Sequence, residues 1–235
     1  MALTATATSV TLSAVIQRLG MMSPNIIGIS PHRPNIMYSA TPLKTVDEFT
    51  SDLCDDILSL SGILKTIIFC HRYQDCSNVY LSLQLQLGKH FTDPVGYPNR
   101  HSYRIVEMYT RATTCELKEK IVSSFSMPDS RLKVIIATTA FGMGIDCPNV
   151  RRIIHFGAPG EIEQYVQETG RAGRDGEQAY AILMYGNKRH VSEEMIHYAE
   201  NSTECRRQLL FRNFILCHEH PYVASNNCCD ICAKS

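Results

Sequence analysis

Two arginines in a glycine-rich turn are the residues of this sequence that most clearly could do chemistry. Arg171 and Arg174 lie three positions apart, and Gln167 lies one helical turn before them. A guanidinium keeps its charge and can donate parallel hydrogen bonds to phosphate oxygens. The glycines around the pair are Gly170, Gly173 and Gly176. Because glycine adds no bulk, the turn predicts two guanidinium groups aimed at a phosphate chain; two arginines alone would equally suit a solvated basic turn.

A glycine pair upstream strengthens the phosphate interpretation. Gly142 and Gly144 flank a single residue, and Asp146 follows two positions later. Glycines permit a tight turn whose N–H groups can meet an anion. The apolar run Val134–Ala137 predicts a buried parallel strand. Asp146 would then follow the carboxyl end of that strand, where α/β sheets place ligand chemistry.

The ten cysteines gather most densely at the end of the sequence. Four of them could close a tetrahedral zinc site: Cys205, Cys217, Cys229 and Cys232. The spacing Cys229-x-x-Cys232 is typical of a zinc knuckle, because two thiolates of a tight turn can meet one ion. Other residues could substitute within this set, namely Cys228 for Cys229, and His218 or His220 for Cys217. Four thiolates leave no position for water, so the predicted zinc is structural.

The elements that must position these residues follow from hydrophobic periodicity. Five apolar strands are expected to start near Thr66, Arg104, Leu132, Arg152 and Ala179. Helices are expected at Ser9–Leu19, Thr45–Leu60, Asp75–Gly88, Cys115–Phe125, Glu161–Thr169 and Arg206–Phe214. The proline-rich residues 21 to 44 are expected to be a linker with one short strand, Ile26–Ile29. Strands alternating with helices predict an open parallel α/β sheet with helices on both faces.

Composition argues against a membrane-spanning protein and a disulfide framework, and it does not decide whether the protein binds nucleic acid. The 235 residues carry a formal net charge of zero, so bulk charge gives no argument for nucleic-acid binding. No apolar run reaches the length of a membrane span, and no targeting segment opens the sequence. Single cysteines within apolar patterns favour buried thiols in a reducing compartment over a disulfide framework.

Four short sequence motifs, taken together, resemble those of the RecQ family of superfamily 2 helicases. AFGMGID and QETGRAGRDG match the last two motifs of that family nearly letter for letter, ALTATA resembles its third motif, and TIIFC its fourth. The resemblance implies a RecA-like second motor domain at residues 45–186 and a small helical zinc-binding subdomain at residues 187–235. Residues 1–44 would be a remnant of the first motor domain with a linker.

The resemblance also implies roles for single residues. Arg174 would be the arginine finger of ATP hydrolysis, assisted by Arg171 and Gln167. The residues expected to bind ATP with Mg²⁺ are Gly142, Gly144, Asp146, Gln167, Arg171 and Arg174. Those expected to hold DNA phosphates are Arg72, Thr138 and Thr139. Arg72 stands where relatives have a serine, and Thr110-Arg111 replaces a His-Ala-Gly turn, so the DNA contacts depart from the family pattern.

The resemblance therefore predicts the C-terminal portion of an ATP-dependent 3′-to-5′ DNA helicase. Its partners would be ATP, single-stranded DNA and duplex DNA, its metal Zn²⁺, its setting DNA repair and recombination, and its location the nucleus. The sequence contains neither the phosphate loop G-x-x-x-x-G-K-[ST] nor an acidic magnesium box after a strand. We therefore expect the first motor domain to be missing and this chain alone to be inactive.

Two further interpretations belong to other classes. The chain could be a catalytically inactive module that binds nucleic acid or protein, which the missing phosphate loop favours. It could also be a phosphate-binding metabolic enzyme of the doubly wound type, which Gly142 and Gly144 alone would allow. The second alternative accounts for neither the arginine pair nor the cysteines.

Overall fold

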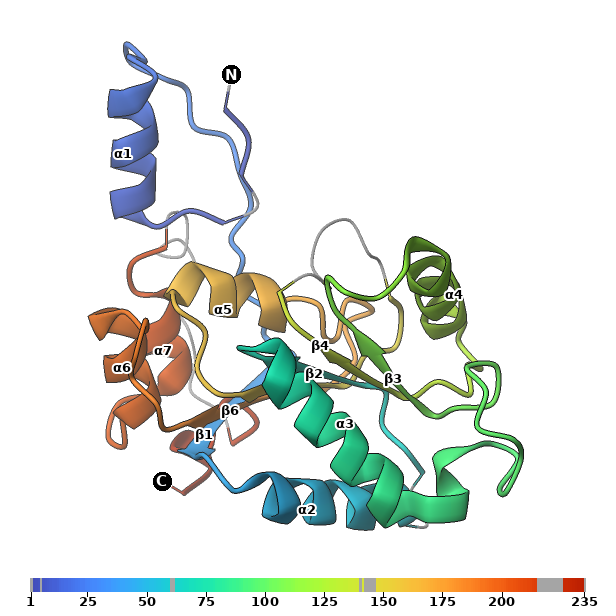
Figure 1. The fold of residues 1–235 in the computed structure, drawn as a ribbon. Coiled ribbons are helices and arrows are strands. Elements are labelled where there is room, and N and C mark those ends of the chain that lie inside the picture. Colours follow the sequence, from blue (N-terminus) through green and yellow to red (C-terminus); the bar gives the residue numbers. More distant parts are fainter. Residues whose placement is uncertain are drawn as a thin grey trace.

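A six-stranded parallel sheet forms the centre of the computed structural model (Figure 1). The structure describes residues 2–4, 6–59, 62–139, 141, 147–214 and 226–234. The strands are β1 (Ile36–Pro42), β2 (Thr66–Cys70), β3 (Val106–Tyr109), β4 (Val134–Ala137), β5 (Arg152–Phe156) and β6 (Ala179–Tyr185). Their order across the sheet is β1-β6-β5-β2-β4-β3. No helix within the described ranges is long and apolar enough to cross a membrane.

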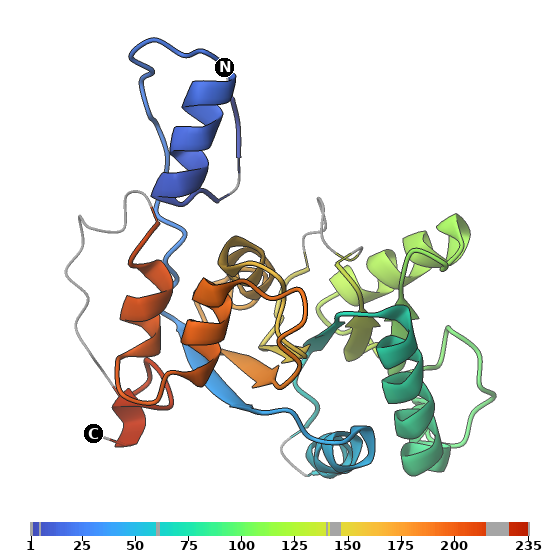
Figure 2. The ribbon, with the colours of Figure 1, turned by 60° about the vertical axis from the view of Figure 1, so that its left-hand side comes forward.

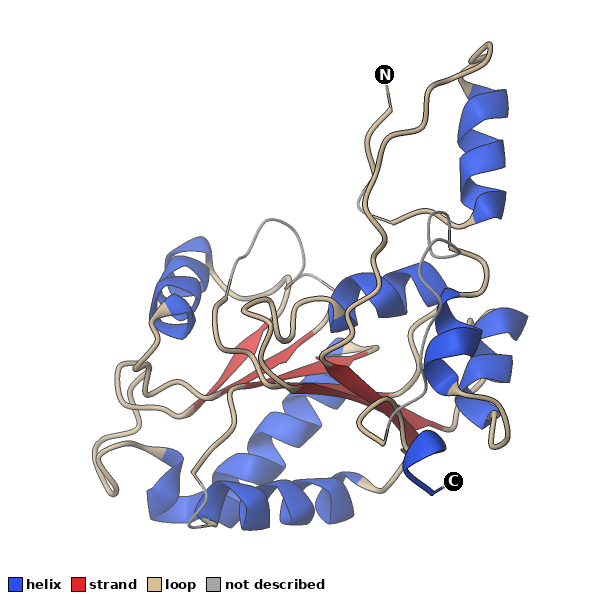
Figure 3. Cartoon of the chain, turned by 180° about the vertical axis from the view of Figure 1, so that it is seen from behind, coloured by secondary structure: helices blue, strands red, loops and turns tan. Residues whose placement is uncertain are grey.

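Side chains of the central strands alternate between two cores, one on each face of the sheet. Ile67 of β2 and Ile153 of β5 belong to one core, whereas their neighbours Ile68 and Ile154 belong to the other. The strands are buried on both faces, which explains why their sequences are continuous apolar runs without alternation. The expected open parallel sheet with helices on both faces is confirmed (Figure 3).

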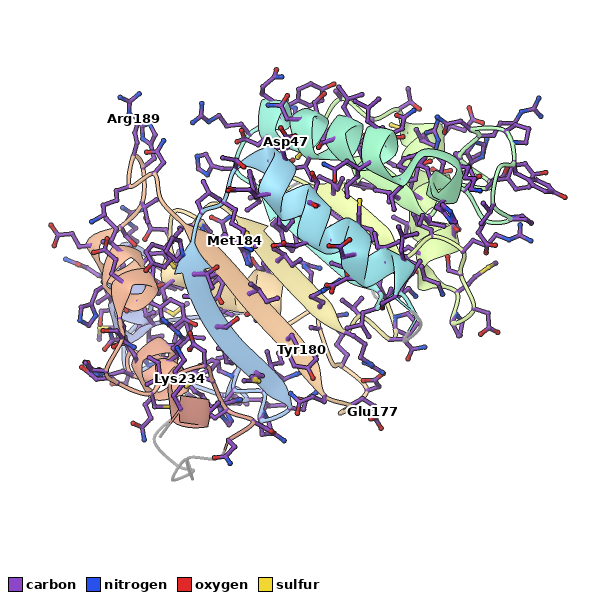
Figure 4. The ribbon with its side chains drawn as sticks, turned by 90° about the horizontal axis from the view of Figure 1, so that it is seen from below. Asp47, Glu177, Tyr180, Met184, Arg189 and Lys234 are labelled. Atoms are coloured by element: carbon purple, nitrogen blue, oxygen red, sulfur yellow. The ribbon has the colours of Figure 1, made fainter. Side chains whose placement is uncertain are left out.

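Helices α2 (Val46–Leu58) and α3 (Tyr73–Leu87) cover one face (Figure 4). Thr45 starts α2 with a capping box: its side chain accepts from the N–H of Glu48, whose carboxylate accepts from the N–H of Thr45. Phe49 of α2 and Val79 of α3 pack into the core beneath them. The helix expectations at Thr45–Leu60 and Asp75–Gly88 are therefore confirmed to within a few residues.

The other face carries α4 (Cys115–Ser126) and α5 (Ile162–Thr169), with α6 (Glu193–Glu200) and α7 (Arg206–Phe211) on the β1 side of the molecule (Figure 2). Short 3₁₀ turns lie at Gly88–Phe91 and Cys232–Lys234. Buried residues of all four helices join one core with the sheet, so the cysteine-bearing end of the chain packs against the sheet and its helices.

The first helix, α1 (Ser9–Arg18), stands away from the sheet (Figure 1). None of its residues is buried. It is tied to the body at its start, where Thr8 bridges to Phe214 and the hydroxyls of Thr8 and Thr11 donate to Glu163 of α5 at 2.8 and 2.9 Å. The residues that follow the ALTATA segment therefore contact α5, the helix that precedes the arginine turn.

The expected linker is wrong in two respects. Ile26–Ile29 forms no strand, and Ile27 and Ile29 are almost fully exposed. Residues 36–42 instead form β1, which pairs along its length with β6. Pro42 ends this strand at the sheet edge, where a missing N–H costs little. The proposed domain boundary at residue 44 stays a prediction, although β1 belongs to the sheet of the following domain.

Candidate functional site

The arginine turn follows α5 directly and leads into β6. Arg171 is buried, whereas Gln167 and Arg174 are exposed. Gly170 ends the helix, with its N–H bonded to the carbonyl of Val166 at 2.9 Å. One predicted arginine is therefore held inside the protein, and the other is presented at the surface.

Gly173 is fixed by a close approach of the chain to Asn35. The side-chain amide of Asn35 donates to the carbonyls of Gly173 and Glu177 at 2.8 and 2.7 Å. Gly173 has a φ of +58°, and a Cβ there would lie 2.3 Å from Nδ2 of Asn35. Its N–H donates to the carbonyl of Val150 at 2.9 Å, just before β5 begins. Only glycine fits this position without displacing its neighbours.

A bidentate ion pair closes the turn from its other side. The guanidinium of Arg151 donates to both carboxylate oxygens of Asp175, at 2.6 and 3.0 Å. This hydrogen bonding lowers the pKa of Asp175. Arg151 and Asn35 each precede a strand, so the turn is held at the amino end of the sheet, where Figure 4 labels Glu177 beyond the start of β6.

The electrostatics of Arg171 favour an anionic ligand. Burial lowers the pKa of its guanidinium, and the charge of Arg174 lowers it further, while Glu168 and Cys147 act in the opposite direction. Two guanidinium groups close enough to repel each other gain from an anion that neutralises both. The phosphate interpretation of the pair thus has a physical basis, and the roles of Arg171, Arg174 and Gln167 remain predictions.

Gly142, Gly144 and Asp146 lie outside the described residues. Their flanking residues Phe141 and Cys147 are buried, and Cys147 lies close enough to Arg171 to affect its pKa. The described end of the predicted nucleotide loop therefore approaches the arginine turn.

A buried hydrogen bond that the sequence did not suggest joins α5 to β5. Nε2 of His155 lies 2.7 Å from a carboxylate oxygen of Glu168, and both side chains are buried. The amide of Gln164 donates to the second oxygen at 3.1 Å, and the imidazole stacks on Phe69. The sequence feature that could have indicated this contact is the histidine between apolar residues of the strand. The contact fixes the helix that carries Gln167 and leads to Arg171.

The predicted DNA-binding residues lie at the carboxyl ends of the strands. Thr138 is partly buried and Thr139 exposed, immediately after β4. Arg72 is exposed at the start of α3, with Nε 3.9 Å from the carboxylate of Asp75. Thr139 and the neighbour of Arg72, His71, line one small hollow. The structure thus brings Thr139 near the His71–Arg72 segment at one edge of the sheet.

The basic residues near the terminal cysteines bind groups of the protein itself. Arg206 is buried and pairs with Asp230 at 2.5 Å. Arg207 is buried and donates to the carbonyls of Arg33, Pro34 and Ile36. Arg212 pairs with Glu204. Arg206 and Arg207 therefore satisfy buried acceptors of the protein.

Four thiols converge at the end of the chain. The Sγ atoms of Cys205, Cys228, Cys229 and Cys232 all lie within 4.8 Å of one another. Those of Cys205 and Cys228 are 3.4 Å apart, and the N–H of Cys232 donates to Sγ of Cys229 at 3.4 Å. Bonds of about 2.3 Å to zinc put tetrahedral thiolates at similar separations, so this donor set fits the ion.

Cys205, Cys229 and Cys232 of the predicted ligand set are therefore brought together. Cys217, His218 and His220 lie outside the described residues, and Cys228 occupies the fourth position of the described cluster. The segment also lies along the sheet edge: the N–H of Asp230 donates to the carbonyl of Tyr38 at 3.0 Å. A metal here would secure the last segment of the chain against β1.

Comparisons with known proteins agree with this architecture. The model of the helicase conserved C-terminal domain matches residues 50–176. ATP-dependent DNA helicase Q1 of Mus musculus is 33% identical over 250 residues, which cover 100% of this chain and 36% of the relative. RecQ-like DNA helicase BLM of Xenopus laevis is 31% identical over 259 residues, which cover 97% of this chain and 18% of the relative. The chain thus spans about a third or less of these relatives.

A solved structure shares the fold at low sequence identity. Dbp5 of S. cerevisiae, bound to RNA and ADP BeF3, superposes with a TM-score of 0.60 at 17% identity. The match covers 89% of this chain and 48% of that one. This similarity supports the RecA-like fold and does not extend to ligands.

We predict that Gly173→Ala destabilises the protein more than Gly176→Ala. Both glycines have positive φ, for which a side chain costs about 1–3 kcal/mol. Only at Gly173 would the new Cβ also collide with Asn35 and a carbonyl, whereas the space at Gly176 is open. Urea unfolding of the two variants measures the difference. Equal losses of unfolding free energy would show that the close approach to Asn35 is unimportant.

We also predict about one zinc ion per chain. Cys229→Ser and Cys232→Ser should abolish it, because each removes one of four thiolates, whereas Cys115→Ser, at an exposed cysteine on α4, should not. Elemental analysis of protein purified without chelators measures the metal, and comparison of Cys217→Ser with Cys228→Ser identifies the fourth ligand. Wild-type protein without zinc would contradict the site.

Proposed function

The chain belongs to the helicase family defined by this conserved C-terminal domain, with RecQ-type relatives along its whole length, and we propose that it supplies the second motor domain and zinc-binding region of an ATP-dependent 3′-to-5′ DNA helicase. The observation that carries the proposal is the clamped arginine turn between α5 and β6. A turn held on both sides can present charge to a ligand without the cost of ordering it first.

In this mechanism Arg174 is the arginine finger. Its exposed guanidinium reaches the γ-phosphate of ATP and stabilises the charge that develops during hydrolysis. Arg171, buried one turn earlier, orients and reinforces that positive charge, and Gln167 contributes an amide from the exposed side of α5. Gly142, Gly144 and Asp146, which lie outside the described residues, are proposed to bind the nucleotide as well. The phosphate loop and magnesium ligands that a motor requires are not among these 235 residues, so a partner domain must provide them.

On the nucleic-acid side, Thr138, Thr139 and Arg72 hold backbone phosphates of single-stranded DNA. They follow β4 and β2, whose carboxyl ends lie side by side in the sheet. Opening and closing of the ATP cleft would move these contacts relative to those of the partner domain, which produces stepping along the strand. The 3′-to-5′ direction, unwinding of duplex DNA, repair and recombination, and nuclear location are proposed from the RecQ resemblance.

Zinc in this proposal has a structural role. When bound, the ion supplies cross-links among its thiolates and no reactive water. Cys205, Cys229 and Cys232 would hold it, together with Cys217 or Cys228, and so join the start of α7 to the segment along β1.

A second candidate function is a binding module without catalysis. The lack of a phosphate loop in these residues favours it, because without that loop and the acidic magnesium ligands a RecA-like domain has no groups to hold magnesium and a triphosphate. Such a module would still bind DNA, but Arg174 would have no catalytic role.

We predict that Arg174→Ala, introduced into an ATP-competent helicase containing this chain, lowers kcat about a thousandfold or more. Loss of the finger removes charge stabilisation from the transition state, so kcat should fall far more than KM rises. Arg212→Ala removes an exposed arginine that pairs with Glu204 and serves as the matched control. Steady-state ATPase kinetics with single-stranded DNA measure both. A variant at position 174 that keeps most of its turnover would exclude the finger role.

A further inference from the structure

A cavity of about 450 Å³ lies beyond the carboxyl ends of the strands, next to the predicted DNA contacts. On one side it is lined by His71 and Arg72, between β2 and α3, and on the other by Arg189 and His190, between β6 and α6. Figure 4 labels Arg189 beyond the end of β6, far from Glu177 at its start. Residues more than a hundred positions apart in sequence therefore enclose one space.

The cavity continues into the smaller hollow that contains Thr139. Both are lined by His71, Gly157 and Ala158, so they form one depression, the carboxyl-end groove, defined by Thr139, His71, Arg72, Gly157, Arg189 and His190. Gly157 has a φ of +99° with no atom within 4 Å of where a Cβ would lie. Gly157, which lines both hollows, therefore adds no side chain that would fill the space between them.

The charges in the groove are mostly positive. Arg72 and Arg189 contribute guanidinium groups, and His71 and His190 contribute imidazoles. Asp75 is the one carboxylate among the lining residues of the larger cavity, and it lies 3.9 Å from Nε of Arg72, too far for a tight hydrogen bond. The smaller hollow is also lined by Glu168, whose buried carboxylate is hydrogen-bonded to His155 and Gln164. All four basic side chains are exposed, so an anion can reach them without rearrangement.

The lining suits a phosphate backbone better than a base. Phe156 is the one aromatic residue of the larger cavity and is 7% exposed, so it offers no surface on which a base could stack. Basic groups instead occur at successive points from the His71–Arg72 segment to the Arg189–His190 loop. This arrangement matches a chain of phosphates that crosses the sheet edge.

We propose that the carboxyl-end groove binds consecutive backbone phosphates of single-stranded DNA, from Thr139 past Arg72 to Arg189. This inference rests on the proposed function and extends its DNA track from β4 and β2 across to β5 and β6. It assigns phosphate contact to Arg189, with His190 beside it, in the loop that follows β6. Because the contacts are to phosphates, binding is independent of base sequence and strongly dependent on salt.

The test is Arg189→Gln in the 235-residue chain, with a fluorescent oligothymidine and anisotropy measured over a series of salt concentrations. We expect several-fold weaker binding and a salt slope smaller by about one, as for loss of one phosphate contact. Arg131→Gln is the matched control, since Arg131 is an exposed arginine at the opposite, amino end of β4. Lys188→Gln is the neighbour control, since Lys188 pairs with Glu200 at 2.6 Å and does not line the cavity. Neither control should change the slope.

Several outcomes would overturn the proposal. If the Arg189→Gln protein binds the oligonucleotide like wild type, or if all three variants weaken it equally, the groove holds no strand. If calorimetry shows that this substitution weakens binding of ADP or inorganic phosphate and leaves the oligonucleotide unaffected, the cavity is a mononucleotide or phosphate site. If wild-type protein binds no oligonucleotide at all, the DNA track of the proposed function fails together with this extension.

Discussion

The close approach of Gly173 to Asn35 is the constraint on which the candidate nucleotide site depends. It joins the arginine turn to the residue before β1, while Arg151 joins the same turn to the start of β5. The approach is possible because Gly173 has no Cβ and a positive φ. The backbone geometry of this turn therefore helps to place Arg171 and Arg174 close together, although their like charges repel each other.

The same segment connects this turn to the cysteine-rich end of the chain. Arg207 of α7 is buried against the carbonyls of Arg33, Pro34 and Ile36, which surround Asn35. Cys205 lies immediately before α7, and Cys228 and Cys229 lie beside Tyr38 of β1. A structural zinc would thus stabilise the helix that holds the Asn35 segment, which in turn holds Gly173. Under the proposed function, a bound zinc would thus support the nucleotide site through these contacts, although its thiolates would not touch the nucleotide.

Sequence alone predicted most of the fold, because buried parallel strands leave continuous apolar runs and the helices carry clear periodicity. Strand β1 was missed since its sequence, Ile36–Pro42, mixes small and polar residues and contains a proline that only an edge strand tolerates. Ile26–Ile29 had strand composition but found no partner in the described sheet. The burial of Arg206 and Arg207 was not predicted, because burial of a charge depends on carbonyls and carboxylates that are distant in sequence. The bond between His155 and Glu168 was unpredictable for the same reason.

In the proposed function, this chain is one wall of a two-domain ATP site, and its arginines act on a triphosphate held by another domain. The most direct measurement is ATP hydrolysis by the purified 235-residue polypeptide, with magnesium and saturating single-stranded DNA. We predict no turnover above the uncatalysed background, even with folded and zinc-loaded protein. Robust, DNA-stimulated hydrolysis by this polypeptide alone would contradict it, because the residues described here would then suffice to bind and cleave ATP.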